Sequence, residues 1–372
     1  MGPLSHAPMQ PCPRPERETQ GRDGNVSVMD PANGRVTLHD VARELGMSVT
    51  QTSRALNDKW DVAEKTKERA RAVAAELGYV PNLEARRLKT GSVRADAIGL
   101  VLPQSELHFS NAFFAELLSG LVATATAKQI EVRLTVGVAP ANDFKNYEQA
   151  LVWRQVDGFV LVRTEVDDPR IGFLAEADFP FVAFGRGCEN PDFPFVDDVD
   201  HVMSPIVEHL VALGHRRIAC IIEPARFSMS HHRFLSFENA VTDLGIPVDP
   251  DLVVEADFDE DSGYVAAQKL FQRTDRPTAI VAQNDLLALG VLGAARDAGI
   301  RVPDELSVTG FDDIMAGRYA TPGLTTVRRS PRIVGETLCL QLLDLVNGTA
   351  EADPQVLLEG KIVVRDSTGP VR

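Results

Sequence analysis

The sequence is poor in aromatic residues, cysteines and long apolar runs, and each shortage removes a class of protein. Aromatic residues make up only 6% of the 372 positions, and the 4 cysteines, Cys12, Cys188, Cys220 and Cys339, are widely spaced. They form no CxxC pair or Cys/His cluster with metal-ligand spacing, so we expect reduced thiols, no metal site and no cofactor. No run approaches the roughly 18–20 consecutive apolar residues of a membrane span.

The N-terminus lacks the apolar stretch of a secretory signal. Residues 1–34 are polar, contain repeated prolines and offer little apolar surface to bury. We therefore expect a disordered leader there, and a protein that stays in the cytoplasm.

Positive charge is scarce overall but clustered. The chain has a net charge of −15, which at first argues against a nucleic-acid partner. Residues 35–91, however, hold 11 Lys/Arg and 8 Asp/Glu, whereas residues 92–372 carry a net −17. A small basic module before a large acidic one is typical of a phosphate-binding domain joined to a separate second domain.

Two short helices are predicted within residues 36–56. Thr37 is the expected N-cap of the first, with Asp40 three residues later, and Gly46 ends it. Ser48 is the expected N-cap of the second helix, and a third is predicted over 64–77. A helix, a tight turn and a second helix with a polar face favour a helix-turn-helix that enters the major groove of DNA. Any helical hairpin could show the same bare pattern.

After residue 95, continuous apolar runs alternate with amphipathic stretches. The predicted strands are 97–102, 132–136, 158–162, 181–184, 218–222, 279–282 and 307–311. The predicted helices are 113–128, 202–213, 233–244, 263–272, 286–298 and 333–346. This alternation indicates parallel sheets buried on both faces, and the length exceeds one comfortable core. We therefore expect two α/β lobes.

Specific sequence blocks add a family resemblance. They are 36–57, Leu77-Gly78-Tyr79-Val80-Pro81-Asn82, Arg86-Arg87-Leu88, Leu213-Gly214-His215, Asn284-Asp285, Gly310-Phe311-Asp312-Asp313 and Leu324-Thr325-Thr326-Val327. In this order they resemble the lactose/galactose repressor family of bacterial transcription regulators. The resemblance implies an all-α helix-turn-helix domain (35–81), a hinge helix and linker (82–94), and a two-lobed α/β effector-binding and dimerisation domain like periplasmic sugar-binding proteins (95–372).

The resemblance also implies DNA contacts. Val49 and Thr50 match the operator-discriminating positions, and Arg54 matches a base-reading arginine suited to guanine, with a phosphate contact or a surface salt bridge as the alternative. Thr52 departs from the family by placing a hydroxyl at a normally apolar packing position. The complete expected set is Leu38, His39, Ser48, Val49, Thr50, Gln51, Ser53, Arg54, Asn57, Asn82, Ala85 and Leu88.

Within the hinge, Leu88 matches the family's apolar wedge, which enters the minor groove as a pair from two subunits and kinks the duplex. An ordinary linker helix is the alternative. The wedge pair implies a homodimer on a pseudo-palindromic operator.

An effector is expected between the two lobes. The candidate contacts are Phe109, Arg186, Arg233, Asn284 and Asp312. Arginine, aspartate and asparagine hydrogen-bond adjacent sugar hydroxyls, and an aromatic ring covers the apolar face of a sugar. The alternatives are an interlobe salt bridge for Arg233 and loop capping for Asn284 and Asp312. The nearby carboxylates at 197, 198 and 200 are interpreted as a solvated loop without calcium.

The favoured function is a transcription regulator, a repressor that leaves double-stranded operator DNA when a small carbohydrate binds. A purine-type corepressor is the alternative within this class, and a solute-binding protein is an alternative outside it. The chain has no Walker A loop, GxGxxG or GxSxG, so we do not expect an enzyme.

Overall fold

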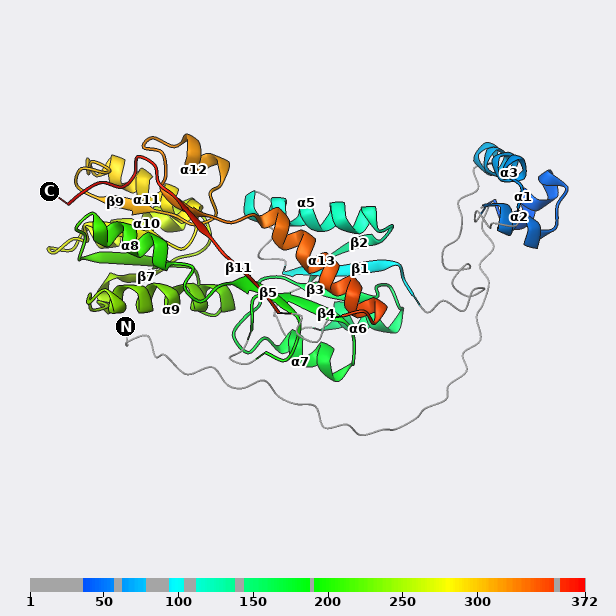
Figure 1. Ribbon diagram of the computed structural model, residues 1–372, viewed down its shortest axis with the longest axis horizontal. Helices are drawn as coiled ribbons and strands as arrows, with labels where there is room; N and C mark the ends of the chain where they lie inside the picture. Colours follow the sequence, from blue (N-terminus) through cyan, green and yellow to red (C-terminus); the bar gives the residue numbers. More distant parts are fainter. Residues whose placement is uncertain are drawn as a thin grey trace. The chain divides into compact units, whose positions relative to one another are not determined.

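The structure is a computed structural model that describes residues 36–56, 62–77, 94–103, 112–137, 144–187, 191–350 and 355–371. The chain divides into two compact units at Arg94 and Ala95, shown in Figure 1. Within the described ranges, no helix is long and apolar enough to cross a membrane.

The N-terminal unit is a small three-helix bundle: α1 (Leu38–Leu45), α2 (Val49–Leu56) and α3 (Glu64–Glu76). The predicted capping box at Thr37 and Asp40 is confirmed, and Gly46 ends α1 in the left-handed conformation, with φ 66°. Its core is made of small and medium apolar side chains: Val41, Leu45, Ala55, Ala70 and Ala74.

The C-terminal unit contains two α/β lobes, as predicted. Lobe 1 has a parallel sheet in the order β11-β5-β4-β3-β1-β2. Its strands are β1 (Ala97–Pro103), β2 (Glu131–Gly137), β3 (Gly158–Leu161), β4 (Phe181–Phe184), β5 (Phe195–Asp198) and β11 (Gln355–Leu358). Its helices are α5 (Ala112–Ala127), α6 (Lys145–Val152), α7 (Pro169–Glu176) and α13 (Pro331–Asn347).

Lobe 2 has a parallel sheet in the order β7-β6-β8-β9. Its strands are β6 (Ile218–Ile222), β7 (Val253–Glu255), β8 (Ala279–Ala282) and β9 (Ser307–Thr309). Its helices are α8 (Ser204–Ala212), α9 (Ser228–Asp243), α10 (Glu260–Phe271), α11 (Asp285–Asp297) and α12 (Met315–Tyr319), with a short 3₁₀ helix at Pro250–Leu252. An antiparallel pair, β10 (Thr326–Arg328) and β12 (Lys361–Val363), joins this lobe.

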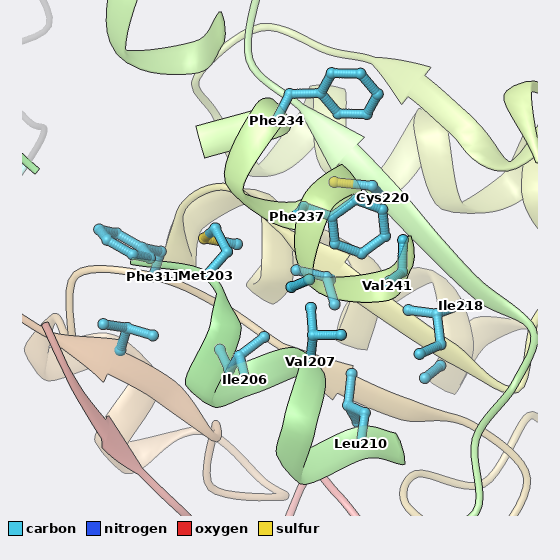
Figure 2. Packing of buried hydrophobic residues seen from close by; sticks show 14 of the residues in the cluster. Met203, Ile206, Val207, Leu210, Ile218, Cys220, Phe234, Phe237, Val241 and Phe311 are labelled. Atoms are coloured by element: carbon cyan, nitrogen blue, oxygen red, sulfur yellow. The ribbon is translucent and has the colours of Figure 1, made fainter. Parts of the chain in front are cut away.

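Continuous apolar strands are explained by cores on both faces of each sheet. In β6, Ile218, Cys220 and Ile222 face the core beneath α8 and α9, which Figure 2 shows in part. The alternate residues, Ala219 and Ile221, face the core beneath α10 and α11. Because no face of β6 is left to water, the strand needs no polar residue.

In lobe 1, α5 and α13 cross at a contact between glycines. A Cβ atom added to Gly335 would collide with the backbone of Leu117, and one added to Gly120 would collide with the backbone of Arg332. The two helix backbones therefore approach too closely for any side chain at these positions.

The described chain passes between the lobes at three places: from β5 to α8, from β10 to α13, and from β11 to β12. The first two passages bring Asp198 and Arg329 to the boundary between the lobes, and these two residues lie at the centre of the site described next.

Candidate DNA-reading helix and effector site

The second helix of the N-terminal unit is held at its start by a second capping box. The backbone N–H of Gln51 donates to Ser48 Oγ at 3.2 Å, and the backbone N–H of Ser48 donates to Gln51 Oε1 at 3.4 Å. This confirms Ser48 as the helix start. It also gives Gln51, an expected DNA contact, a capping role.

One face of α2 is exposed and the other is used for packing. Thr50, Gln51 and Arg54 are exposed, whereas Thr52 and Ala55 are buried against the other helices. The remaining expected contacts in this unit lie at its surface or are half-buried: Leu38, His39, Ser48, Val49 and Ser53. The expected contacts Asn57, Asn82, Ala85 and Leu88 lie outside the described residues.

Thr52 occupies the core position that the sequence identified as unusual. Its side chain is fully buried, and its Oγ1 has no hydrogen-bond partner. A buried hydroxyl without a partner costs about 1–3 kcal/mol, so this residue weakens the packing of the helix that it belongs to.

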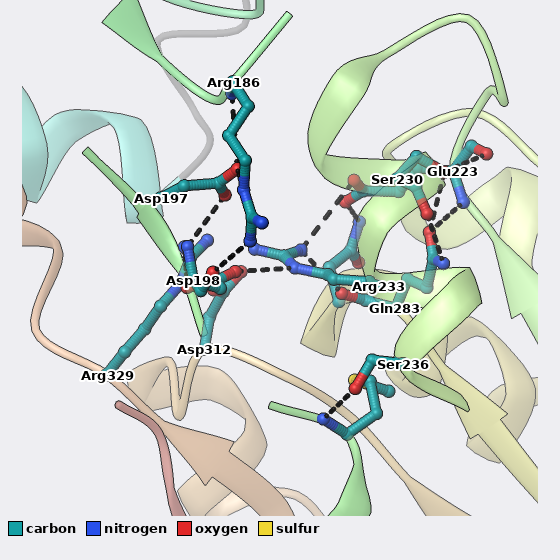
Figure 3. A network of polar contacts seen from close by, with 12 residues as sticks. Arg186, Asp197, Asp198, Glu223, Ser230, Arg233, Ser236, Gln283, Asp312 and Arg329 are labelled. Carbon is teal, nitrogen blue, oxygen red and sulfur yellow. Dashed lines mark hydrogen bonds and ion pairs between the residues drawn. The ribbon is translucent and has the colours of Figure 1, made fainter. Parts of the chain in front are cut away.

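The interpretation of residues 197–200 as a solvated loop is wrong for its first two carboxylates. Asp197 and Asp198 end strand β5 and are 1% and 4% exposed, and only Asp200 is exposed. They are buried because arginines surround them, as Figure 3 shows. Among the described residues, no group of His, Cys, Asp or Glu side chains is arranged to hold a metal ion.

Arg186 comes directly after β4 and binds the carboxylates of its own lobe. Its Nε lies 3.0 Å from Asp197 Oδ2, its Nη1 lies 2.5 Å from Asp200 Oδ1, and its Nη2 donates to the backbone oxygen of Asp198 at 2.8 Å. Burial and the neighbouring charge of Asp198 raise the pKa of Asp197 to about 6, against the opposing effect of Arg186. The structure therefore places Arg186 at the edge of the site with its donors engaged.

Arg233, on α9 of lobe 2, reaches the boundary between the lobes. Its Nε lies 3.1 Å from Asp198 Oδ2, and its Nη1 donates to the backbone oxygen of Gln283 at 3.1 Å. The guanidinium is stacked on the ring of Phe311, 4.2 Å from the centroid. Its Nη2 is buried and has no hydrogen-bond partner. The interlobe salt bridge considered from the sequence is thus present, and one strong donor is left over for another molecule.

Arg329 was not predicted, yet it connects the two lobes at the same point. Its Nη1 lies 2.9 Å from Asp198 Oδ1, and its Nε lies 3.0 Å from Asp312 Oδ1. Burial alone would raise the pKa of Asp198, but Arg329 and Arg233 together lower it below its ordinary value. No local sequence pattern marks Arg329. It lies shortly before a helix, and exposed arginines are equally common at such positions.

Asp312 is held in an uncommon conformation just after β9. Its φ of 109° is in a region that few residues other than glycine adopt, and its backbone N–H donates to the oxygen of Val327 at 2.9 Å. Strain of this kind persists where surrounding contacts enforce it, often at functional sites. Burial raises the pKa of Asp312, opposed by Arg329 and Arg233.

Asn284 follows β8 and performs the capping role that the sequence left open. Its Oδ1 accepts from the backbone N–H of Leu287 at 2.7 Å and starts α11, while its Nδ2 donates to Glu223 Oε1 at 2.8 Å. Burial raises the pKa of Glu223, whose Oε2 lies 3.9 Å from Arg233 Nη1. Glu223 and Gln283 were not predicted as site residues. Each directly follows a predicted strand, and because ligands bind at the carboxyl ends of parallel strands, this position was a signal that could have identified them.

Aromatic rings lie beneath the guanidiniums. Arg329 is 4.2 Å from the centroid of Phe113 and 5.2 Å from that of Phe311, and Phe113 stacks on Phe184 at 5.8 Å. The expected aromatic contact Phe109 lies outside the described residues. The rings that the structure brings to the site are therefore those of Phe113, Phe184 and Phe311.

The lobes also touch through their backbones, beside this charged cluster. The backbone N–H of Val166 donates to the oxygen of Arg226 at 2.8 Å, and that of Ser228 donates to the oxygen of Thr164 at 2.9 Å. In addition, the N–H of Gly187 donates to Ser228 Oγ at 3.0 Å. These contacts join loops of lobe 1 to the start of α9 in lobe 2, so the lobes are closed on each other here.

The three-helix unit with one open helix face and the two-lobed α/β unit together define a DNA-binding regulator with a ligand-binding domain. Comparisons with known proteins agree with this class. Residues 37–82 match the model of bacterial regulatory proteins of the lacI family, and residues 207–368 match a periplasmic binding protein-like domain. The chain belongs to the LacI family of bacterial transcription regulators, which are not enzymes.

Curated relatives extend over nearly the whole chain. The HTH-type transcriptional regulator AglR of Rhizobium meliloti (strain 1021) is 32% identical over 341 residues, covering 90% of this chain and 95% of its own. The HTH-type transcriptional repressor PurR of Yersinia pestis (strain Pestoides F) is 32% identical over 342 residues, covering 90% and 98%.

Solved structures with the same fold include two full-length matches. The Lac repressor dimer bound to operator and the anti-inducer ONPF has a TM-score of 0.80 at 27% identity, covering 90% of this chain and all of its own. The transcriptional regulator CelR in complex with cellobiose has a TM-score of 0.69 at 29% identity, with the same coverage. The family and the fold predicted from the sequence are thus confirmed.

Proposed function

We propose that this protein is a homodimeric repressor that acts in the cytoplasm, binds a pseudo-palindromic operator and leaves it when a neutral carbohydrate binds between its lobes. The observation that carries the effector half is the buried Nη2 of Arg233, a charged donor without a partner. The same cluster of contacts includes Asn284, through Glu223, and Asp312, through Arg329. A buried unsatisfied donor is costly, and a ligand oxygen would remove that cost.

On the DNA side, α2 is the reading helix. Val49, Thr50 and Arg54 address base edges, and Ser48 and Ser53 address phosphates, with Leu38 and His39 of α1 at the groove edge. This assignment is supported by the exposure of Thr50 and Arg54 opposite the buried Thr52. Asn57, Asn82, Ala85 and Leu88 complete the contact set from the family resemblance, the last three within the hinge segment 82–94.

The charge of the site favours a neutral effector. The three guanidiniums of Arg186, Arg233 and Arg329 are each paired with carboxylates of the same cluster. A phosphate or carboxylate ligand would meet no uncompensated positive charge and would have to lose its own hydration. A sugar, in contrast, can accept from Arg233 and donate to Asp312 through adjacent hydroxyls.

The second candidate is a purine-type corepressor. Phe113, Phe184 and Phe311 favour it in one respect, because flat rings can stack on a planar base. Arg329 already covers these rings, with its guanidinium 4.2 Å from Phe113 and 5.2 Å from Phe311, which leaves the sugar as the better fit.

Dimerisation is supported by an apolar groove on lobe 1. A hollow of about 500 Å³ runs between α5 and β2 and is lined by Leu118, Val122, Ile130, Val132 and Leu134 among others. Val122 and Leu134 are each 40% exposed. A second copy that covers this face would bury them, and a dimer supplies the two reading helices that a pseudo-palindromic operator requires.

The test is thermal unfolding of the full chain with neutral mono- and disaccharides, cellobiose included, with sugar phosphates and with purines. A ligand at about 100 times its dissociation constant adds roughly 2.7 kcal/mol to the free energy of unfolding. We expect a neutral sugar to stabilise the wild type but not Arg233→Lys, which keeps the charge and loses the free Nη2. Stabilisation by purines alone would reject the carbohydrate and support the second candidate.

A further inference from the structure

A single carboxylate ties together the parts of the chain that must move if the lobes separate. Asp198 ends β5 of lobe 1 and lies on the first passage between the lobes. Its Oδ2 binds Arg233 on α9 of lobe 2, at 3.1 Å, and its Oδ1 binds Arg329 on the second passage, at 2.9 Å. Arg329 in turn binds Asp312 of lobe 2, at 3.0 Å. We call Asp198, Arg233, Asp312 and Arg329 the interlobe clamp; Figure 3 shows them side by side.

The clamp engages one side of Arg233 and of Asp312, two of the proposed effector groups, and leaves the other side open. Arg233 uses Nε and Nη1, and its Nη2 has no partner. The ion pair of Asp312 is made through Oδ1. Each group is thus oriented by a partner within the chain, and the atom that can meet a ligand is not the atom that Asp198 or Arg329 occupies.

We propose that Asp198 and Arg329 are positioning residues, which orient Arg233 and Asp312 and keep the two lobes closed before any effector binds. The orientation of effector groups rests on the proposed function, whereas the closure of the lobes does not. Asp198 acts as an internal anion: it pairs with two buried guanidiniums from different parts of the chain, Asp312 supplies the second negative charge, and all four clamp side chains are at most 8% exposed. Separation of the lobes would break these charge-assisted hydrogen bonds, which are among the stronger ones in a protein, and the cost of their loss favours the closed form.

A second, independent contact reports on closure. The backbone N–H groups of Val166 and Ser228 donate across the lobe boundary to Arg226 and Thr164. Neither amide belongs to a clamp residue. Their hydrogen exchange therefore measures how often the lobes separate, without requiring an effector or an operator.

The experiment is hydrogen exchange of the full-length protein, resolved to single amides, for the wild type, Arg329→Gln and Asp198→Asn. We expect Val166 and Ser228 to exchange at least about tenfold faster in both variants, because a hydrogen bond to a charged group is among the stronger ones in a protein. The matched control is Arg217→Gln. Arg217 also binds two carboxylates, Asp249 and Asp275, but all three lie in lobe 2. We expect wild-type exchange in this control.

A single substitution leaves an unpaired buried charge and can prevent folding, so the double variant Asp198→Asn/Arg329→Gln is included. Circular dichroism identifies the variants that fold. Wild-type exchange at both amides in any folded clamp variant would overturn the proposal. Accelerated exchange in the clamp variants, together with a wild type that responds to no sugar, would reject the carbohydrate effector and keep the clamp. A wild type that responds to a sugar, together with unchanged exchange in the clamp variants, would reject the clamp and keep the carbohydrate effector.

Discussion

The buried hydroxyl of Thr52 provides the sharpest test of how the DNA-reading helix is stabilised. Valine has nearly the same shape as threonine and a similar helix propensity, so Thr52→Val removes the unpaired Oγ1 and little else. Leaving a buried polar group unpaired costs about 1–3 kcal/mol, and we expect the N-terminal unit to gain about 1 kcal/mol. For a unit of this size, that raises the melting temperature by roughly 4–8 °C.

The same chemical change at Thr37 should have the opposite sign. Thr37 Oγ1 accepts from the backbone N–H of Asp40 at 3.4 Å and donates to Asp40 Oδ2 at 2.7 Å. Thr37→Val should therefore lower stability by about 1 kcal/mol. Thermal unfolding of the full chain, with hydrogen exchange of the α2 amides to identify the N-terminal transition, measures both. If Thr52→Val destabilises the unit, the hydroxyl has a partner and our reasoning about this helix is refuted.

Three further predictions address the other unit and the DNA. Burial raises the pKa of Asp285 to about 8 from an ordinary 3.8, so the folded protein holds a proton that the unfolded chain releases, and its stability should fall as the pH rises from about 4 to 8. Asp285→Asn mimics the protonated form and should flatten this fall by on the order of 5 kcal/mol in urea titrations at several pH values; an unchanged slope contradicts the assignment. Gly335→Ala should destabilise lobe 1 by about 2 kcal/mol or more through collision with Leu117, measured by chemical unfolding, and a neutral effect would show that the helices can separate there. Arg54→Ala should reduce discrimination at one operator base by about 1–3 kcal/mol in a selection from random DNA, whereas a uniform loss across all sequences would indicate a phosphate contact instead.

The strands buried on both faces could be predicted from the sequence. The predicted runs at 97–102, 218–222 and 279–282 correspond to β1, β6 and β8. Each is continuously apolar because a core lies on either side of its sheet. The capping boxes were also predictable, since the hydrogen bonds of Thr37 and Ser48 reach only three residues along the chain.

Elements whose stability comes from distant residues could not be predicted. Strand β5 ends in two aspartates, which by themselves suggest a solvated turn. Asp198 is buried because the fold brings Arg233 and Arg329, 35 and 131 positions away, to the same point, and Asp197 is paired with Arg186 of the preceding strand end. Helices α6 and α7, each 8 residues long, were also missed.

The candidate site was predictable where residues follow apolar strands, and it was not where they lie on the passages between lobes. Asn284 and Asp312 follow predicted strands. Asp198 and Arg329 take their importance from the topology, which no local pattern encodes.

The three passages between the lobes also bear on how the protein is made. Lobe 1 is built from residues 97–198 together with α13 and β11, so its sheet receives its outer strand from Gln355–Leu358, near the end of the chain. During synthesis β5 therefore waits with an unpaired edge while all of lobe 2 except β12 is produced. A chain released early would present that edge, and the buried charges at its end, to other molecules. The helix-turn-helix unit is complete long before then, so a truncated product would retain its reading helix without a finished first lobe.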